Sequence, residues 1–599
     1  MTRHVSGQLR GSQVITTYGP GSLLDLPYDS AIVSGLESWG NPAKLPKVEE
    51  PRLARKLQMI AGLANRPGLY APPPAPELPW EKGPTIGARR FPEWFLSQPV
   101  TKDSGSSRTR ERKLVHRRVL DDKLKLDGDR VVPIRFVRAC PRGHIADINW
   151  RWFVHGSDDT CNRPLWVIEQ GQGDLGEIRV RCECGKGRNL ADALDLSKHA
   201  LGSCFGDRPW LGGSHNEECG LPARLLTRTA SNAYFSQVVS VLSLPDRGSE
   251  ITKVVNQLWD DLSIVDDAAG LAFIKKKPHI AEALASWDDA EVLKAIDDAR
   301  KGGLDMRPVK LVELDAILSA QEGYGDDQPV DPNFHARRLP GKAWRGSSTS
   351  GPVKAIYQLH RLREVLALAG FTRFEAIVPD INGEYDSDVE PAALAIDPTW
   401  FPAVENRGEG IFIELRADAV GEWIGRESVQ ERLHSLVEGQ TKWNEDRNTD
   451  RPFPTGPYVL LHTLSHLLIQ SLSLRCGYPT SSIRERVYAD LAENRFGLLL
   501  YTASPDSEGT LGGLVQQARH IESHLSHAFR LGSLCSNDPI CAQHNPATSL
   551  EERWLHGAAC HGCTLVPETC CEMRNEYLDR ALVVPVLGCE DAAFFEAQG

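Results

Sequence analysis

Cysteine and histidine side chains at short spacings are the residues of this 599-residue chain whose types could support chemistry. The stretch GAACHGCTLVPETCCE, residues 557–572, places Cys560, Cys563, Cys570 and Cys571 around a histidine and a proline. Thiols at such spacings can pair as disulfides, act as nucleophiles or converge on a metal ion. The first question is therefore which of these three roles the segment has.

The fourteen cysteines bunch into an early and a late group, with Cys476 apart from both. The local spacings CEC, CSNDPIC and CHGC let neighbouring sulfur atoms share one ion, each about 2.3 Å from zinc. Buried apolar cysteines, the alternative, explain single residues but not this pairing. The pattern therefore predicts zinc at both groups.

In the late group, zinc needs four ligands, because structural zinc sites are tetrahedral. We expect Cys571, rather than its neighbour Cys570, to join the two cysteines of CHGC. One cysteine of CSNDPIC would be the fourth ligand, which leaves Cys589 as a bystander. The late candidates are Cys535, Cys541, Cys560, Cys563 and Cys571.

The early group offers more donors than one ion needs, so two ions fit there as well as one. The candidates are Cys140, His144, Cys161, Cys182, Cys184, Cys204 and Cys219. A closed tetrahedral set has no open position for a water molecule. Sites so rich in thiolate are therefore expected to brace the fold rather than to catalyse.

A histidine pair in HTLSHLLIQSL is the main catalytic alternative, because His462 and His466 lie four apart on an expected helix and face the same way. The metalloprotease motif needs a glutamate after the first histidine, where this chain has Thr463. With Asp506 and Glu508 of YTASPDSEGTLGGL, the pair would form a metal-dependent nuclease or other hydrolase. The apolar flanks favour a buried helix whose imidazoles bond neighbouring segments.

Composition excludes several other classes. The formal net charge of −12 and 41% hydrophobic residues are ordinary for a soluble globular protein. No apolar run approaches the roughly 20 residues of a membrane span, and the amino terminus lacks the apolar core of a secretion signal. We therefore expect a cytoplasmic protein, a compartment in which lasting disulfides are rare.

Common enzyme motifs are missing from the sequence: there is no GxxxxGK[ST], no GxSxG and no dinucleotide fingerprint after a clear strand. We expect a non-enzymatic protein that contacts nucleic acid, if at all, through local basic clusters. The candidate DNA-binding strip lies in HARRLPGKAWRG, although a charged surface loop explains it equally well. Its residues are Arg337, Arg338, Lys342, Trp344 and Arg345.

The fold class predicted is α+β, a multidomain chain with mixed helices and strands and cysteine-rich modules stapled by zinc. QVITTYGPGSLLDLP predicts a strand and turn, GEIRVRC a strand, and AIYQLHRLREVLALAG an amphipathic helix closed by Gly370. Four segments are expected: an N-terminal α/β region (1–135), a cysteine-rich zinc module (136–225), a mainly helical middle (226–400) and a C-terminal zinc-binding region (401–599).

Several motifs also carry a family resemblance. HTLSHLLI, YTASPDSEGTLGGL, CSNDPIC and AACHGCTLVPETCCEMRNEYLDR occur in one order and resemble the zinc-binding C-terminal domain of MrfA-type repair helicases. QVITTYGPGSLLDLP, CPRGHIADINW, RTASNAYFS, REVLALAGFTR and ENRGEGIFIEL extend the likeness across most of the chain. In these stretches the chain resembles the DrmB family of the bacterial DISARM antiphage systems.

The resemblance implies a zinc-binding subunit without a motor of its own. Such a subunit would work with a separate helicase, DrmA, and support its engagement of foreign DNA, single-stranded or strand-separated. The family's zinc pattern falls on the late candidates, and Cys570 stands where a small residue such as serine is expected. A pure assembly scaffold that touches no nucleic acid is the remaining alternative.

Overall fold

The fold is described from a computed structural model of the chain. It describes residues 9–596 except 27–28, 75–84, 105–106, 158–159, 171–173, 213–215, 246–250, 252–253, 256, 301–306, 330, 347–349, 386–389, 505–512 and 549–552. The chain divides into two compact units. The first unit comprises 1–240, 366–377 and 387–404, and the second comprises 241–365, 378–386 and 405–599.

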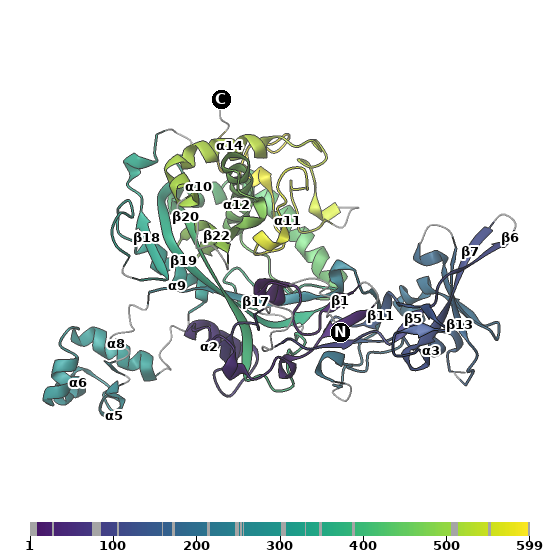
Figure 1. Ribbon diagram of the computed structural model, residues 1–599. Helices are drawn as coiled ribbons and strands as arrows, with labels where there is room; N and C mark the ends of the chain where they lie inside the picture. Colours follow the sequence, from purple (N-terminus) through teal and green to yellow (C-terminus); the bar gives the residue numbers. More distant parts are fainter. Residues whose placement is uncertain are drawn as a thin grey trace. The chain divides into compact units, whose positions relative to one another are not determined.

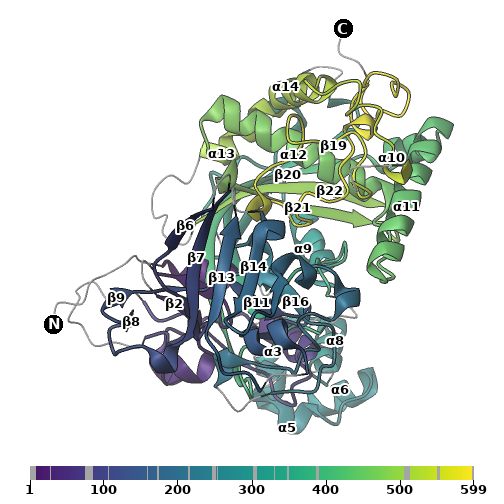
Figure 2. The same ribbon diagram turned by 90° about the vertical axis from the view of Figure 1, so that its right-hand side faces the viewer.

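Helices and antiparallel sheets occur together in the chain, so the α+β prediction is confirmed (Figures 1 and 2). The expected segment boundaries near 135 and 225 both lie inside the first unit. The division into four segments therefore stays a prediction. Among the described helices, none is both long and apolar enough to cross a bilayer.

The first unit contains two sheets that hold the early cysteines. The larger has the order β10-β5-β7-β13-β14-β15, with β6 beside β7, and the smaller has the order β12-β11-β16. Ile178, Val180 and Cys182 of β14 are buried and alternate with more exposed arginines, so the strand predicted at GEIRVRC is confirmed. The bounds are β5 Trp94–Leu96, β6 Val100–Ser104, β7 Ser107–His116, β10 Val132–Pro133, β11 Phe136–Ala139, β12 Ile145–Ala146, β13 Leu165–Gln170, β14 Ile178–Cys182, β15 Gly187–Asn189 and β16 Arg224–Thr227.

The amino-terminal part of the first unit differs from its prediction. QVIT lies in a helix, α1, and the strand begins later, at β1. Arg10 N donates to Gln13 Oε1 at 2.9 Å, and Val14 and Ile15 are buried on this short helix. The remaining elements are α1 Gly11–Thr16, β1 Leu23–Asp25, β2 Ser30–Val33, α2 Pro51–Ile60, β3 Gly68–Tyr70, β4 Ala88–Arg90, β8 Lys125–Leu126, β9 Asp129–Arg130, α3 Trp150–His155 and β17 Phe235–Leu242.

The second unit is built on part of a sheet whose strands follow the order β17-β19-β20-β22-β21, with β18 beside β19 and β3 beside β20. β20 pairs antiparallel with β22, and β22 with β21. The two longest strands, β19 and β20, have residues in both units. The bounds are β18 Phe334–Arg338, β19 Val353–Thr372, β20 Trp400–Leu415, β21 Ile483–Asp490 and β22 Arg495–Ser504.

The helix predicted at AIYQLHRLREVLALAG is wrong, because this segment is part of β19. Nearly all of its side chains are buried, so both faces of the strand are covered and the apolar residues show no alternation. Such a run also fits helical spacing, which explains the error. Gly370 is no helix cap: a Cβ there would lie 2.8 Å from Pro391 Cβ, so the strand needs glycine for this close approach.

The helix α12 forms the centre of the second unit. It packs on α14 and on β21 and β22, and almost every side chain from Gly456 to Leu472 is buried. The helix expected at HTLSHLLIQSL is therefore confirmed, as is its burial. The helices of the second unit that are described outside the small core at α5–α8 are α9 Val309–Leu318, α10 Ala417–Ile424, α11 Glu427–Arg447, α12 Gly456–Cys476, α13 Gly513–Gln516 and α14 Ile521–Ser533.

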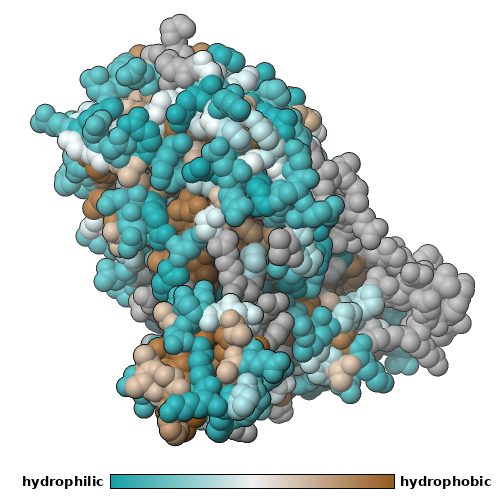
Figure 3. All heavy atoms as spheres, turned by 90° about the vertical axis from the view of Figure 1, so that its left-hand side faces the viewer, coloured by the Kyte–Doolittle hydropathy of each residue, from teal (hydrophilic) through white to brown (hydrophobic). Residues whose placement is uncertain are grey.

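Among the described residues between β17 and α9, four helices share a separate small core. They are α5 Trp259–Leu262, α6 Ala268–Ile274, α7 Pro278–Ala283 and α8 Asp289–Arg300. Figure 3 shows apolar side chains on the surface over these helices, and Ile264 and Phe273 are 71% and 69% exposed. Single exposed apolar residues of this kind are common and need no special explanation.

Candidate metal centres

Four groups of metal-binding side chains come together in the part of the chain that the structure describes. In each group four donor atoms lie within 4.8 Å of one another, and four is the number that tetrahedral zinc takes. All of the cysteines are unpaired. Cluster 1 is Cys140, His144, Cys204 and Cys219; cluster 2 is His155, Cys161, Cys182 and Cys184; cluster 3 is Cys535, Cys541, Cys560 and Cys563; cluster 4 is His462, His466, Glu485 and Cys571.

Cluster 3 brings together both cysteines of CSNDPIC and both of CHGC. Its sulfur atoms lie 3.4 Å apart for Cys535 and Cys560, 3.6 Å for Cys560 and Cys563, and 3.7 Å for Cys541 and Cys563. A disulfide would need about 2.05 Å, whereas a tetrahedron of sulfurs at 2.3 Å from zinc has edges of about 3.8 Å. The donor set and its spacing therefore fit zinc.

The loops around cluster 3 are held by Asp538 and Arg580. The Asp538 carboxylate accepts from the backbone N–H groups of Cys535 at 3.1 Å and Ala542 at 3.0 Å, which fixes the first ligand turn after α14. The fully buried Arg580 bonds Asp538 and donates to Gly532 O at 2.8 Å. The guanidinium lies close to the sulfur atoms of Cys563 and Cys541, so its positive charge offsets part of the negative charge of a thiolate there.

Cys571 does not belong to this group. The expected late set joined Cys571 to CHGC and one further cysteine, but the structure gathers all four other cysteines and places Cys571 in cluster 4. Cys570 lies in neither cluster, and its Sγ is 3.3 Å from Thr480 O. Sequence reasoning placed Cys571 with the cysteines nearest to it in the chain. Its neighbours in cluster 4 are instead His462, His466 and Glu485, which come about a hundred residues earlier.

Cluster 1 is built from a tight turn at CPRGH. Cys140 N donates to His144 O at 3.1 Å, Gly143 N donates to Cys140 O at 3.0 Å, and Gly143 has the positive φ of +86° that this turn needs. Cys140 Sγ lies 3.3 Å from His144 Nδ1 and 3.9 Å from Cys219 Sγ. Nδ1 is thus the His144 atom that faces the thiols.

The other nitrogen of His144 contacts a carboxylate. His144 Nε2 lies 2.5 Å from Glu217 Oε1, and Arg208 donates to Glu217 Oε2 at 3.0 Å. A carboxylate behind the distal nitrogen fixes the ring and its tautomer, as in many zinc sites with a histidine ligand. Glu217 thus positions His144 without being a ligand itself.

Cluster 2 repeats the same turn at CECGK. Cys182 N donates to Lys186 O at 2.8 Å and Gly185 N to Cys182 O at 3.0 Å, with φ of +99° at Gly185. Cys161 Sγ lies 3.6 Å from Cys182 Sγ, and Cys184 Sγ lies 3.7 Å from His155 Nε2. The two groups divide the early donors into two complete sets of four.

Sequence reasoning missed His155 as a ligand candidate. It is the last residue of α3, and no cysteine stands within five residues of it in INWRWFVHG. Its turn carries no ligand spacing, so no local pattern marks it. The tertiary packing of α3 against β14 is what brings it to the cysteines.

Backbone groups around the cysteines favour thiolates. The N–H two residues after the cysteine donates to Sγ at Cys182, Cys204, Cys535 and Cys560, at 3.3 to 3.5 Å. A hydrogen bond from the Cys541 thiol lowers the pKa of Cys563 to about 5, and one from Cys140 lowers the pKa of Cys204 to about 4. Clusters 1 and 3 thus each hold a thiolate at neutral pH, the form that binds metal.

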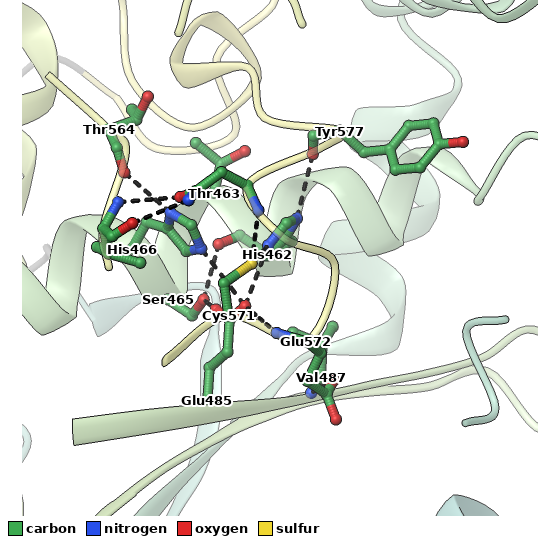
Figure 4. Close-up of polar contacts among 12 residues, drawn as sticks. His462, Thr463, Ser465, His466, Glu485, Val487, Thr564, Cys571, Glu572 and Tyr577 are labelled. Carbon is green, nitrogen blue, oxygen red and sulfur yellow. Dashed lines mark hydrogen bonds and ion pairs between the residues drawn. The ribbon is translucent and has the colours of Figure 1, made fainter. Parts of the chain in front are cut away.

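Cluster 4 is the most deeply buried group, with both histidines at 0% exposure (Figure 4). His462 and His466 lie one turn apart on α12, Glu485 comes from β21, and Cys571 follows a short 3-10 turn. Burial alone would raise the pKa of Glu485, but His462 and His466 hold it well below the usual range. The Glu485 carboxyl is therefore ionised.

The hydrolase alternative rested on four residues. His462 and His466 are together, but Asp506 and Glu508 lie outside the described residues. The carboxylate beside the histidines is Glu485, which sequence reasoning did not identify. Because both histidines are fully buried, no substrate reaches their ring nitrogens in this arrangement.

The candidate DNA-binding strip is only partly a surface. Arg338 is half exposed and donates to Glu322 at 3.0 Å, while Arg337 pairs with Asp327. Lys342 and Arg345 are exposed, and the Arg345 guanidinium lies over the Trp344 ring. Trp344 itself is 5% exposed and packs in the core of the second unit, which leaves it no free face for a base.

Comparison with known proteins matches both ends of the chain. The MrfA Zn-binding domain family matches residues 464–564, and a domain of unknown function, DUF8724, matches residues 10–235. The DISARM protein DrmB of Bacillus paralicheniformis is 31% identical over 493 residues, which cover 78% of this chain and 82% of that protein.

The fold and the donor sets define an α+β zinc-binding protein with an MrfA-type zinc-binding domain, and the predicted cofactor, zinc, is confirmed. The matched range holds all four ligands of cluster 3. By the extent and identity of its relative, the chain belongs to the DrmB family of DISARM proteins. The family resemblance drawn from the sequence motifs is therefore confirmed.

Proposed function

We propose that this chain is a non-enzymatic, zinc-braced subunit that partners a separate DrmA-like helicase and helps it engage DNA in antiphage defence. The observation that carries the proposal is that each metal group in the described residues is a closed set of four protein donors. Such a set leaves no open position for water or substrate, so the ions would stabilise surfaces rather than react. The missing ATPase motif and the family membership both support a motor on another chain.

DNA contact in this proposal is local. Arg338, Lys342 and Arg345 are the exposed cations of the strip, and the chain as a whole carries a formal charge of −12. A few cations on an acidic protein contact backbone phosphates weakly and without sequence preference. The helicase would supply the rest of the path for a single or separated strand.

The test is a gel-shift titration of the zinc-loaded full chain on end-labelled single-stranded and duplex DNA, with magnesium, alone and with its helicase. We expect a salt-sensitive shift of intact DNA that strengthens with the helicase. Cleavage that disappears in His462→Ala would instead establish a nuclease. If the DNA does not shift either with or without the helicase, the remaining hypothesis is a pure assembly scaffold that touches no nucleic acid.

Charge reversal locates the contact. Arg338→Glu with Lys342→Glu should weaken binding and reduce the salt slope by about one per lost phosphate contact. Lys44→Glu with Lys123→Glu, two exposed lysines of the first unit, makes the same charge change as a control. Equal weakening by both pairs would contradict a role for the strip.

A further inference from the structure

Cluster 4 has the geometry of a metal site of its own. His462 Nε2 lies 3.1 Å from both Cys571 Sγ and Glu485 Oε1, and His466 Nε2 lies 3.4 Å from the same Glu485 oxygen. Zinc–nitrogen, zinc–oxygen and zinc–sulfur bonds of 2.0 to 2.3 Å place tetrahedral donors about 3.3 to 3.6 Å apart. The observed separations, 3.1 to 3.4 Å, lie within this range or slightly below it, close enough for the donors to share one ion.

The far sides of the ligands are fixed as they are in metal sites (Figure 4). His462 Nδ1 faces Tyr577 O at 3.3 Å and His466 Nδ1 faces Thr564 O at 2.9 Å. Because a carbonyl only accepts, each Nδ1 carries the proton, and a neutral ring then presents a bare Nε2 to the cluster. Histidine ligands of zinc are oriented in this way.

The other two ligands, Glu485 and Cys571, are held by hydrogen-bond donors. Ser465 Oγ bonds the other oxygen of Glu485, and Glu572 N donates to Glu485 Oε1 at 3.2 Å. Asn575 N donates to Cys571 Sγ at 3.1 Å. These bonds orient the Glu485 carboxyl group and the Cys571 sulfur atom toward the ring nitrogens of the two histidines.

The crowding of donor atoms indicates what lies between them. Two ring nitrogens, one carboxylate oxygen and one sulfur atom face one another within 4.8 Å, and all four residues are buried. Buried polar groups of this kind are unfavourable unless each has a partner. One divalent ion would bind all four donor atoms at once.

We propose that cluster 4 binds a divalent transition-metal ion, zinc, as a centre separate from the thiolate centre of cluster 3. The ion joins α12, β21 and the chain at Cys571 inside the main core of the second unit. With four protein ligands and no exposed donor, it is structural. Only His466 and Glu485 of its ligands fall inside the matched zinc-binding range, which ends before Cys571.

The competing occupant is the proton. A protonated histidine beside Glu485, with a neutral Cys571 thiol, would also remove the repulsion between donors. The two alternatives differ in metal content, so counting ions decides between them. The adjacent cysteines provide matched variants, because Cys570 is buried beside Cys571 but bonds Thr480 O instead of the cluster.

The experiment measures transition metals per folded chain by elemental analysis and native mass spectrometry, on full-length protein purified without chelators. We expect four zinc ions in the wild type, one for each cluster. Cys571→Ala should lose one ion relative to Cys570→Ala, which should keep all four. Equal metal content in the two variants would overturn the proposal.

A wild-type measurement guards against misfolding of Cys571→Ala. Native spectra of the wild type that stop at three ions, with no other transition metal bound, would overturn the proposal without any variant. Glu485→Gln adds a milder change, because the amide keeps the volume of the side chain but is a poorer ligand. We expect it to release one ion to a competing chelator at least tenfold faster than the wild type.

Discussion

Glu217 shows how a residue that is not a ligand controls a metal site. Its carboxylate holds the distal nitrogen of His144 and is itself held by Arg208. We predict that Glu217→Gln lowers the zinc affinity of cluster 1 by about 10- to 100-fold, because the neutral amide is a weaker acceptor for the ring N–H than the carboxylate and no longer raises the basicity of the ligand nitrogen. Competition with a chromogenic chelator measures the affinity.

The adjacent Glu218 is exposed and provides the matched control. Glu218→Gln makes the same chemical change one residue away and should leave zinc affinity unchanged. If the two variants release zinc alike, the carboxylate behind His144 has no positioning role.

His524 makes the second unit sensitive to acid. Burial, reinforced by Arg475, His520 and His527, lowers the pKa of His524 to about 4. The unfolded chain protonates near 6.5, so stability is complete above that pH and is lost as the pH falls toward 4. Between pH 7 and 5.5 the loss should be about 1 kcal/mol.

Hydrogen exchange of the α14 amides at the two pH values, corrected for intrinsic rates, reports this loss. His524→Gln cannot titrate, so its α14 opening free energy should change less with pH than that of the wild type. An unchanged pH dependence in the variant would rule out His524 as the source.

Single residues were predictable where the signal is local. The short spacings in CHGC, CSNDPIC and CEC indicate metal ligands, and all of the cysteines in these motifs lie in clusters 2 and 3. His155 and Glu485 carry no such spacing, and Cys571 finds its partners on α12, far back along the chain. Only packing of distant elements reveals ligands of this second kind.

At the scale of elements, Gly439 lets α11 approach Pro546 and Trp554 closely. A Cβ at this position would lie 2.2 Å from Trp554 O and 2.7 Å from Pro546 Cβ. We predict that Gly439→Ala destabilises the second unit by about 1–3 kcal/mol, because the backbone at Trp554 has to move. The midpoint of denaturant unfolding measures the effect.

Gly421 of α10 is the control, because a Cβ there meets nothing within 4 Å. Gly421→Ala should stabilise by about 0.5–1 kcal/mol through helix propensity alone. A matching loss of stability in both variants would show that the Gly439 contact is unimportant.

The type of an element was predictable where the residues that flank an apolar segment decide between helix and strand. The run at α12 is long and punctuated by Gly477, which has a positive φ and caps the helix. β19 has an equally apolar run that also ends near a glycine, Gly370. That glycine does not cap a helix but allows the close approach of the strand to Pro391. Both segments are buried on every side, so periodicity could not separate them.

At the scale of the whole molecule, both units contain candidate metal clusters. Clusters 1 and 2 lie in the first unit, and clusters 3 and 4 lie in the second. We predict that a strong zinc chelator opens both units, because each ligand set loses the ion that holds its loops together. Limited trypsin digestion should then cut newly within residues 140–219 and 535–574.

Re-addition of zinc before the protease should restore the original fragments, and magnesium should not. If zinc is shown to be gone while the digestion pattern stays the same, the ions are dispensable to the fold. New cuts in one unit alone would confine the dependence on metal to that unit.

The ligand sets are nested in the sequence, with one set lying inside the span of another in each unit. All four residues of cluster 2 fall between His144 and Cys204 of cluster 1, and all four of cluster 3 fall between Glu485 and Cys571 of cluster 4. During synthesis from the amino terminus, each inner set is complete before the last ligand of the outer set leaves the ribosome. Closing the inner loop first shortens the free chain that the outer set must close. The order of translation thus favours correct sorting of thiols that would otherwise compete for the same ion.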